Sequence, residues 1–345
     1  MKRKGHIYEE ICKTETIKFA IQNAARNKRK RFFVRKVADK PDYYAEEIRR
    51  MLVDKTFVPR EYERMELYDG IRRKKRMISK PCFYPDQVIH WAIYIGIREW
   101  IYKGFYYFAC GSIPGKGVHF GKHYVEKWIR SDRKNTKYYL KLDIHHFYPS
   151  IDTHRLVAKL KRRFKDDDLI ELLELILYED DGLPIGMLLS QVFANFYLQD
   201  FDHWMKEDRK VKYYIRYMDD MVIFGSNKKK LHQLRVDIDK RLRSVEGLQL
   251  KGNWQVCKLE AEPLDFMGFR FYRNRTTIRK SIMLRIARRA KRISKKKKIT
   301  HKDAAAIISY MGWVKASDGY SFYQTRLKPY INMQKLKAAI RKGAK

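Results

Sequence analysis

The sequence predicts an α+β fold that ends in a basic, all-helical region. Segments that alternate between apolar and polar residues, as half-buried strands do, are interspersed with helical periodicities up to about residue 275. Beyond Ile278 the pattern is helical and strongly basic. The chain has 345 residues and is 45% hydrophobic, so it can bury a large core. We expect one composite domain with lobes rather than several independent domains.

The charge distribution indicates a polyanionic partner. There are 77 Lys and Arg residues against 40 Asp and Glu, a formal net charge of +37. From Phe266 to Lys302 there are 15 basic residues and no acidic one. The N-terminal 50 residues are helical in pattern and contain the basic run Arg26–Phe33, which is either a solvated helix face or a contact for phosphates. Nucleic acid is the commonest polyanionic partner, and its binding is strongly salt-dependent.

A strand pair followed by an apolar helix is expected in the next part of the chain. Tyr62–Asp86 alternates like two strands around a turn at Asp69-Gly70, a dipeptide that favours hairpins because Gly tolerates positive φ. Asp86 is then expected to cap an apolar helix that stops near Gly104.

The central region reads as a strand and two helices. Tyr138–Ile144 alternates like a strand and places Asp143 at its end. Asp152 or Thr153 is expected to cap a helix with one apolar face, formed by Leu156, Val157, Leu160 and Phe164. The acidic run Asp166–Asp168 opens the second helix, where acidic residues complement the helix dipole.

The following elements are a buried helix, a hairpin and an amphipathic helix. Gly182–Lys206 predicts a Gly/Pro loop that leads into one long buried helix. Residues 213–217 and 221–225 are the arms of a hairpin, and residues 230–247 form an amphipathic helix that stops at Gly247. A second strand pair at 264–272, a lysine loop at 295–298 and an apolar helix at 304–314 complete the expected elements.

Three aspartates fall at strand ends or turns, namely Asp143, Asp219 and Asp220. An Asp-Asp pair alone is commonly an ordinary turn feature. If the first strand lies beside the hairpin, however, the three carboxylates converge, and such clustering is costly without a cation. Mg²⁺ prefers oxygen ligands, and two such ions support phosphoryl transfer. We therefore expect two-metal chemistry on a nucleotide and interpret His145 and His146 as turn residues.

Five ordered motifs resemble those of reverse transcriptases. Tyr217–Asp220, Tyr-Met-Asp-Asp after a strand, looks like the active-site hairpin of that family. The others, over residues 62–275, are LKLDIHHFYPSID from Leu140, LDFMGFRF from Leu264, KKRMISKP from Lys74 and YPDQVIHWAI from Tyr84. The resemblance implies a right-hand polymerase with fingers, an antiparallel palm and a helical thumb. The implied parts are a basic N-terminal extension (1–61), fingers (62–137 with part of 153–190), palm (138–275) and thumb (276–345).

The resemblance also implies the metal site and its ions. Asp143 and Asp219 would ligate two Mg²⁺ ions, with Mn²⁺ as an alternative, and Asp220 would lie close by as part of the catalytic site. The backbone carbonyl of Ile144 would be a further ligand. The implied partners are a template RNA, a cDNA or primer strand, and deoxynucleoside triphosphates.

Other residues would bind the substrates. Lys74 and Arg76 match the fingers cations that hold the triphosphate, and Lys116 would join them or touch the template. Tyr148 falls at the position of the aromatic residue that excludes a 2′-hydroxyl, which implies a DNA product. The remaining implied contacts are Ile185, Gly186 and Gln191 for the nucleotide, Phe266, Met267 and Gly268 for the primer, and Arg285, Arg288, Arg289, Lys291 and Arg292 of the thumb for nucleic acid.

The second palm motif suggests a subtype. Ile185–Gln191 carries Ile where most members resemble Gln, and Gln where they have Pro. With Asn253–Val256, this variant is similar to reverse transcriptases of diversity-generating retroelements. These copy a template-repeat RNA with errors at adenines, and work with a small basic accessory variability protein. A defence-associated bacterial reverse transcriptase and an inactive RNA-binding scaffold are the alternatives, and the thumb could instead dock an acidic protein.

The remaining signals concern location. The four cysteines include no C-x-x-C pair, so neither a zinc site nor a disulfide framework is expected. The N-terminus has no apolar core of a secretory signal, and no run is long enough to suggest a membrane span. We expect a cytoplasmic protein, encoded by a bacterium or a phage.

Overall fold

The structure, a computed structural model, describes residues 3–69 and 74–342. The chain forms two compact units, each made of three chain segments. The first unit contains residues 1–112, 143–211 and 237–252, and the second contains residues 113–142, 212–236 and 253–345. Because the units interleave along the sequence, we describe each unit by itself.

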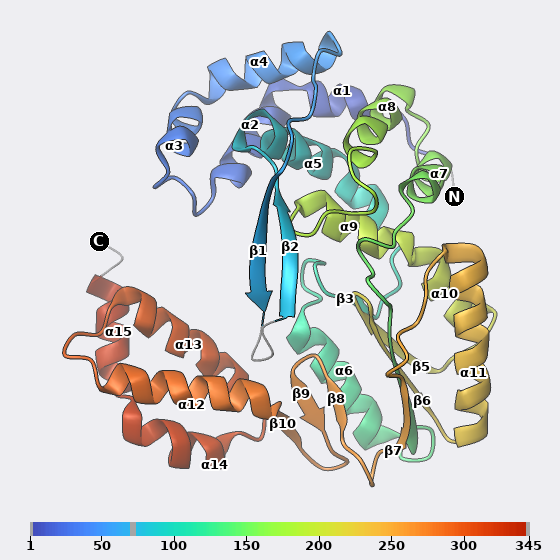
Figure 1. The fold of residues 1–345 in the computed structure, drawn as a ribbon, viewed down its shortest axis with the longest axis vertical. Coiled ribbons are helices and arrows are strands. Elements are labelled where there is room, and N and C mark those ends of the chain that lie inside the picture. The colour runs from blue at the N-terminus through green and yellow to red at the C-terminus, as the bar shows by residue number, and fades with distance from the viewer. Residues whose placement is uncertain (1–2, 70–73, 343–345) are drawn as a thin grey trace. The chain divides into compact units, whose positions relative to one another are not determined.

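The N-terminal part of the first unit is a helical layer (Figure 1). Helix α2 packs against both α4 and α5, and its buried residues Ile17, Ala20, Ile21 and Ala24 recur at helical spacing. The expected N-terminal helices are therefore confirmed. The helices of this layer are α1 (Ile7–Cys12), α2 (Thr14–Ala25), α3 (Phe32–Asp39), α4 (Pro41–Val53) and α5 (Val88–Tyr102).

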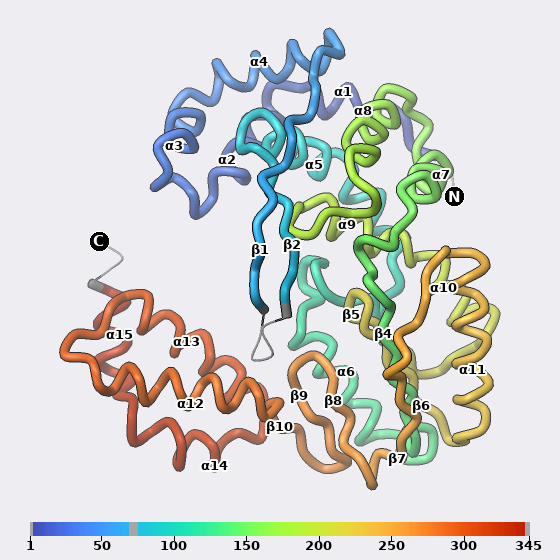
Figure 2. Tube along the Cα trace, in the orientation of Figure 1, coloured from blue at the N-terminus to red at the C-terminus, as the bar shows by residue number. Residues whose placement is uncertain are grey.

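An antiparallel ribbon interrupts this layer between α4 and α5, as Figure 2 traces. Strand β1 (Glu63–Asp69) pairs with β2 (Lys74–Lys80), with Leu67 opposite Arg76. The two expected strands are confirmed, whereas the turn at Asp69-Gly70 reaches beyond the described residues. Several apolar side chains of the ribbon are exposed, including Met65, Leu67, Tyr68 and Met77.

The expected role of Asp86 as a helix cap is wrong. Asp86 lies inside a π-helical turn, η1 (Phe83–Gln87), and α5 begins after Gln87 without a side-chain cap. The Asp86 carboxylate is instead buried and accepts the backbone N–H of Arg60 at 2.9 Å. Burial raises the pKa of this carboxyl above its ordinary value. The helix ends at Tyr102, two residues before Gly104, as expected.

The rest of the first unit is mainly helical and includes one short strand. Asp152 caps α7 by accepting the N–H of Arg155, and Asp166 caps α8 by accepting the N–H of Leu169, so both expected caps are confirmed. The single long helix expected before Lys206 is wrong, because the chain breaks at Leu198 into two helices. The elements are β3 (Ala109–Cys110), α7 (Thr153–Arg163), α8 (Asp167–Leu177), α9 (Leu188–Tyr197), α10 (Gln199–Glu207) and η2 (Leu242–Glu246).

The second unit contains two antiparallel strand pairs that belong to one sheet. Strands β5 and β6 form the expected hairpin, with Tyr217 opposite Asp220. The consecutive order β5-β6-β4-β7 places β4 between β6 and β7, and β7 was not foreseen from the sequence. These strands are β4 (Tyr138–Asp143), β5 (Tyr213–Tyr217), β6 (Asp220–Gly225) and β7 (Gln255–Lys258). Helix α6 (Val118–Ser131), also unforeseen, contacts β5, and α11 (Lys228–Arg241) follows β6.

The C-terminal part of the second unit joins a small sheet to a helical bundle. Strands β8 (Leu264–Phe266), β9 (Phe269–Phe271) and β10 (Thr276–Ile278) are antiparallel. The bundle contains α12 (Lys280–Ser294), α13 (His301–Lys315), α14 (Tyr320–Phe322), η3 (Tyr323–Leu327), η4 (Lys328–Tyr330) and α15 (Met333–Lys342). Ile286, Ile293, Ile307 and Leu336 belong to its core. The expected lysine loop separates α12 from α13.

In the described ranges, no helix is both long and apolar enough to cross a membrane. The four cysteines are free thiols, of which Cys12 and Cys110 are buried.

Candidate functional site

Asp143 ends strand β4 and is held by a neighbouring segment of the first unit. Ile144 forms an antiparallel bridge with Leu250. Its hydrogen bonds run from Lys251 N to the Asp143 carbonyl and from His145 N to the Gln249 carbonyl, both at 2.8 Å. The bridge therefore uses the residues beside Ile144 rather than the Ile144 carbonyl.

The Asp143 side chain is half-buried and faces a cation. Lys251 Nζ lies 2.5 Å from Asp143 Oδ1, and this oxygen is buried without a hydrogen bond of acceptable geometry within the described residues. Lys251 therefore supplies the positive charge that favours a carboxylate in a partly buried place. His145 and His146 are exposed and lie in the following turn, in agreement with the interpretation that they are turn residues.

Asp219 lies in the tight turn between β5 and β6, and Asp220 is the first residue of β6. Met218, the first turn residue, has φ of +56°, a left-handed conformation that is unfavourable for a side chain other than Gly. The guanidinium of Arg216 is buried and donates from Nη1 to the Met218 carbonyl at 2.9 Å. A charge-assisted hydrogen bond thus supports the strained residue next to the two aspartates. Both aspartates are half-buried.

Two of the strands that carry these carboxylates are neighbours in one sheet. Strand β4, which ends at Asp143, is the neighbour of β6, which begins at Asp220. Asp143 belongs to the first unit, and Asp219 and Asp220 belong to the second. Across residues 3–69 and 74–342, no group of three or more His, Cys, Asp or Glu side chains is arranged as a metal site.

The first unit brings together three segments expected to bind the nucleotide. Ser79 of β2 donates its N–H to the Ile185 carbonyl at 2.9 Å, and Leu183 donates to the Tyr148 carbonyl at 2.9 Å. Gly186 has φ of +114°, and a Cβ added there would lie 2.6 Å from Ile78 Cγ2. Only Gly fits this approach of the loop to β2.

The other expected nucleotide contacts are more scattered. The backbone of Lys74 starts β2, and the Arg76 side chain on the same strand is exposed. Gln191 is exposed on the first turn of α9, in the same unit. Lys116 belongs to the second unit, where it is half-buried and its Nζ lies 5.9 Å from the centre of the Phe120 ring.

The expected primer contacts form a tight turn between β8 and β9. Phe266 is buried, and Met267 and Gly268 have φ of +50° and +83°. A Cβ on Gly268 would lie 2.8 Å from ring atoms of Trp313. This turn therefore lies directly against helix α13.

The expected thumb cations lie on α12, which packs through Ile286, Ala290 and Ile293. Four of them, Arg285, Arg288, Lys291 and Arg292, are exposed. Arg289 differs, because it is half-buried and its Nε is buried without a hydrogen-bond partner in the described residues. Leu284 on the same helix is 41% exposed.

Sequence reasoning missed two residues of this site. Lys251 faces Asp143 only because a long-range bridge brings residues 249–251 to β4, and no local pattern signals such a bridge. Arg216 could have been noticed, since an Arg in the middle of a strand of otherwise buried pattern needs an internal acceptor.

Comparison with known proteins identifies the family. Residues 70–271 match the family of reverse transcriptases, described as RNA-dependent DNA polymerases. This match covers more than half of the chain, which therefore belongs to the reverse transcriptase family. The expected fold class, an α+β right-hand polymerase, is confirmed by this match together with the mixed helices and antiparallel sheets.

Individual relatives are more distant. The chain is 30% identical over 145 residues to the retron Ec73 reverse transcriptase of Escherichia coli, with 38% of this chain and 45% of that protein covered. It thus spans less than half the length of this curated relative. Among solved structures, apo telomerase from Candida tropicalis covers 62% of this chain and 47% of its own, with 12% identity and a TM-score of 0.46. Telomerase from Candida albicans, in complex with a fragment of telomeric RNA, gives 10% identity, 87% and 66% coverage, and a TM-score of 0.46.

Proposed function

We propose that this protein is an RNA-directed DNA polymerase that makes cDNA by phosphoryl transfer at Asp143, Asp219 and Asp220. One observation carries the proposal. Strand β4 ends at Asp143, and its neighbour in the sheet, β6, begins at Asp220. We infer from this strand order that the three side chains converge on one edge of the sheet. Membership of the reverse transcriptase family supports the same reaction.

The donor set fits a divalent metal ion. The buried Asp143 Oδ1 lacks a hydrogen bond of acceptable geometry in the described chain and faces the Lys251 ammonium. Carboxylate oxygens are the ligands that a hard cation such as Mg²⁺ prefers. Asp143, Asp219 and Asp220 would hold the metal, together with the Ile144 carbonyl. When bound, Mg²⁺ supplies Lewis acidity at the transferring phosphate.

The chain's own residues would bind and orient the nucleotide. Lys74 and Arg76 on β2 carry positive charge that suits the triphosphate, and the hydrogen bond from Ser79 to Ile185 holds the loop at Gly186 against this strand. The backbone carbonyl of Tyr148 accepts a hydrogen bond from the N–H of Leu183, two residues before Ile185. We propose that the Tyr148 ring excludes the 2′-hydroxyl of ribonucleotides.

Primer extension on an RNA template tests the proposed activity. With Mg²⁺ present, Asp219→Ala and Asp220→Ala should each reduce cDNA synthesis at least ~10²-fold, because transition-state charge would lose its metal support. Asp167→Ala, at an exposed carboxylate on α8, serves as the matched control and should leave synthesis unchanged. Wild-type rates in both active-site variants would exclude this assignment.

We further propose the diversity-generating retroelement subtype, in which a template-repeat RNA is copied with errors at adenines and a basic accessory variability protein takes part. The replacement of Gln by Ile at 185 supports it, since a polar contact to the nascent pair would be lost. Such a loss amounts to about 1 kcal/mol, or a several-fold loss of fidelity. Ile185→Gln should therefore lower misincorporation opposite template adenine, and an unchanged error spectrum would refute the mechanism.

A retron-type reverse transcriptase is the second candidate, favoured by the similarity to the Escherichia coli retron enzyme. The DNA that surrounds the gene distinguishes the two. A pair of near-identical repeats that differ only at adenines would support the retroelement subtype, and their absence would favour the second candidate.

A further inference from the structure

A pocket of about 270 Å³ lies within the first unit, away from the three aspartates in sequence. Its walls come from the loop between α2 and α3, the end of β2, the start of α5 and the loop before α9. The residues that matter here are Lys28, Arg31, Lys80, His90, Trp91 and Gly186. The volume is slightly below the range of roughly 300–1,000 Å³ typical of small-molecule sites, so the pocket suits one nucleotide-sized group.

Positive charge is concentrated at this pocket. Lys28 donates from Nζ to Gln87 Oε1 at 2.7 Å, which holds the ammonium at the wall. Burial lowers the pKa of Lys28, and the charges of Arg31 and Lys80 lower it further. Lys80 is paired with Glu63, so Lys28 and Arg31 are the cations that best suit an added anion. Phosphate is the anion that a polymerase meets most often.

A buried polar atom in the pocket wall also points to a ligand. His90 is 2% exposed, and its Nε2 is buried without a hydrogen-bond partner among the described residues. Burial lowers the pKa of His90 to about 4, so the ring is neutral at pH 7. A neutral imidazole exchanges hydrogen bonds with a nucleobase edge, whereas the adjacent half-buried Trp91 ring offers a stacking surface.

The surroundings favour an RNA strand over a free nucleotide. The basic run Arg26–Phe33 supplies Arg31 to the pocket and ends in two exposed aromatic residues. Phe32 is 73% exposed and Phe33 is 46% exposed, directly after Arg31 in sequence. Cations interleaved with exposed aromatic rings are the usual surface for single-stranded nucleic acid. Gly186, another lining residue of the pocket, belongs to the loop expected to contact the incoming nucleotide.

We propose that this pocket binds one unstacked nucleotide of the single-stranded template RNA, with its phosphate on Lys28 and Arg31 and its base against the part of α5 that carries His90 and Trp91. The inference rests on the proposed reverse transcriptase function. It adds to that function a site for the part of the template RNA that has not yet been copied. Occupancy of the pocket would increase affinity for template without participating in phosphoryl transfer.

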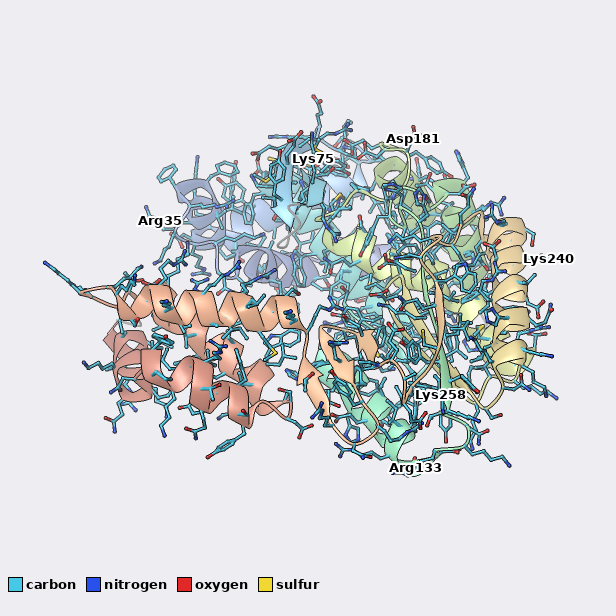
Figure 3. The ribbon with its side chains drawn as sticks, turned by 60° about the horizontal axis from the view of Figure 1, so that its bottom comes forward. Arg35, Lys75, Arg133, Asp181, Lys240 and Lys258 are labelled. Carbon is cyan, nitrogen blue, oxygen red and sulfur yellow. The ribbon has the colours of Figure 1, made fainter. Side chains whose placement is uncertain are left out.

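Binding of the full-length protein to template–primers tests the proposal. Fluorescence anisotropy is measured with an RNA–DNA duplex that has a ten-nucleotide RNA overhang and with the same duplex lacking it. Lys28→Met with Arg31→Met should weaken binding of the overhang substrate at least tenfold and leave the blunt duplex within twofold. His90→Leu keeps an apolar side chain of similar size and should weaken overhang binding about threefold. Lys229→Met with Lys240→Met, at two exposed cations on α11 (Figure 3 labels Lys240), is the charge-matched control.

The outcomes separate the proposal from its alternatives. Equal losses for overhang and blunt substrates would overturn it, because the cations would then act only through general charge. A parallel titration with a fluorescent nucleoside triphosphate tests whether the pocket binds a free nucleotide rather than a template strand. If the variants lose that ligand but keep overhang affinity, the pocket is a free-nucleotide site and the template assignment is wrong. Thermal unfolding of each variant shows whether it is folded before binding is compared.

The binding measurement does not depend on catalysis. If the wild-type protein binds the overhang through this pocket but makes no cDNA, the proposed polymerase function fails and the pocket assignment stands. If it makes cDNA while the variants bind the overhang normally, the pocket assignment fails alone.

Discussion

Arg216 is a fully buried charged side chain whose acceptor is the backbone of the turn that carries Asp219 and Asp220. Its geometry matters more than its charge, because a planar guanidinium can reach the Met218 carbonyl and other partners at once. The turn residue itself is strained, with φ of +56°. The position of the aspartates therefore depends on a residue that belongs to neither the proposed metal site nor the proposed substrate site.

Arg216→Lys should consequently reduce primer extension by about 10- to 100-fold, the effect of one lost charge-assisted hydrogen bond of about 1.5–3 kcal/mol. The KM for nucleotide should change less than kcat, because the substrate contacts remain. Steady-state kinetics on one RNA template measure both constants. Lys212→Arg, at an exposed cation one residue before the same strand, is the control. A loss confined to KM would contradict the proposed positioning role.

His90 should make stability depend on pH. Its folded pKa is about 4, against an ordinary value of 6.5, because the ring is buried. As the pH falls below 6.5, the unfolded chain takes up a proton that the folded protein excludes, so the free energy of unfolding falls until about pH 4. The loss is up to roughly 3 kcal/mol at about 1.4 kcal/mol per pKa unit.

Denaturant titrations from pH 7 to pH 4 measure this effect without RNA. His90→Leu should flatten the profile relative to wild type, whereas replacement of the exposed His119 should not. Parallel profiles for wild type and His90→Leu would show that the buried ring does not resist protonation. The charged groups that line the same cavity as His90 are Lys28, Arg31 and Lys80.

At the scale of elements, the contact between the β8–β9 turn and α13 leaves no room for a methyl group. Gly268→Ala would place Cβ 2.8 Å from Trp313 and 2.9 Å from Ile282, at a φ of +83° that Ala resists. We expect a loss of roughly 1–3 kcal/mol of unfolding free energy. Gly312→Ala, on the same helix with no atom within 4 Å of the added Cβ, should stabilise by up to about 1 kcal/mol.

Thermal and chemical unfolding of the two alanine variants give the comparison. Primer affinity should fall in Gly268→Ala if this turn contacts the primer, and should stay constant in Gly312→Ala. Equal stability of both variants would mean that Trp313 moves aside at no cost.

Helices, strands and caps could be predicted from the sequence where neighbouring residues alone determine them. The hairpin around Asp219, the caps Asp152 and Asp166, and the stop at Gly247 each follow from residues within a few positions. Asp86 was assigned wrongly because a buried acceptor for the distant Arg60 N–H looks, in sequence, like a helix cap. Strand β7 escaped notice because its four residues carry little pattern of their own and depend on pairing with β4.

At the scale of the whole molecule, the net charge of +37 should dominate nucleic-acid binding. Each phosphate contact to single-stranded RNA contributes about −0.7 to the slope of log K against log salt. Replacing Arg285, Arg288 and Arg292 with Gln should thus reduce the magnitude of the slope by about 2. Replacing the exposed Lys229, Lys230 and Lys240 of α11 should change it less. Equal changes in the salt slope for the α12 and α11 variants would mean that α12 makes no specific phosphate contact.

The interleaving of the two units has a consequence for how the protein is made. The first unit needs residues 237–252, and the second needs residues 253–345 as well as two earlier segments. During synthesis, Asp143 therefore emerges about a hundred residues before Lys251, the partner that faces it. Neither unit can be completed by its N-terminal segment alone. Each unit can therefore complete its internal contacts only after all three of its segments have been synthesised.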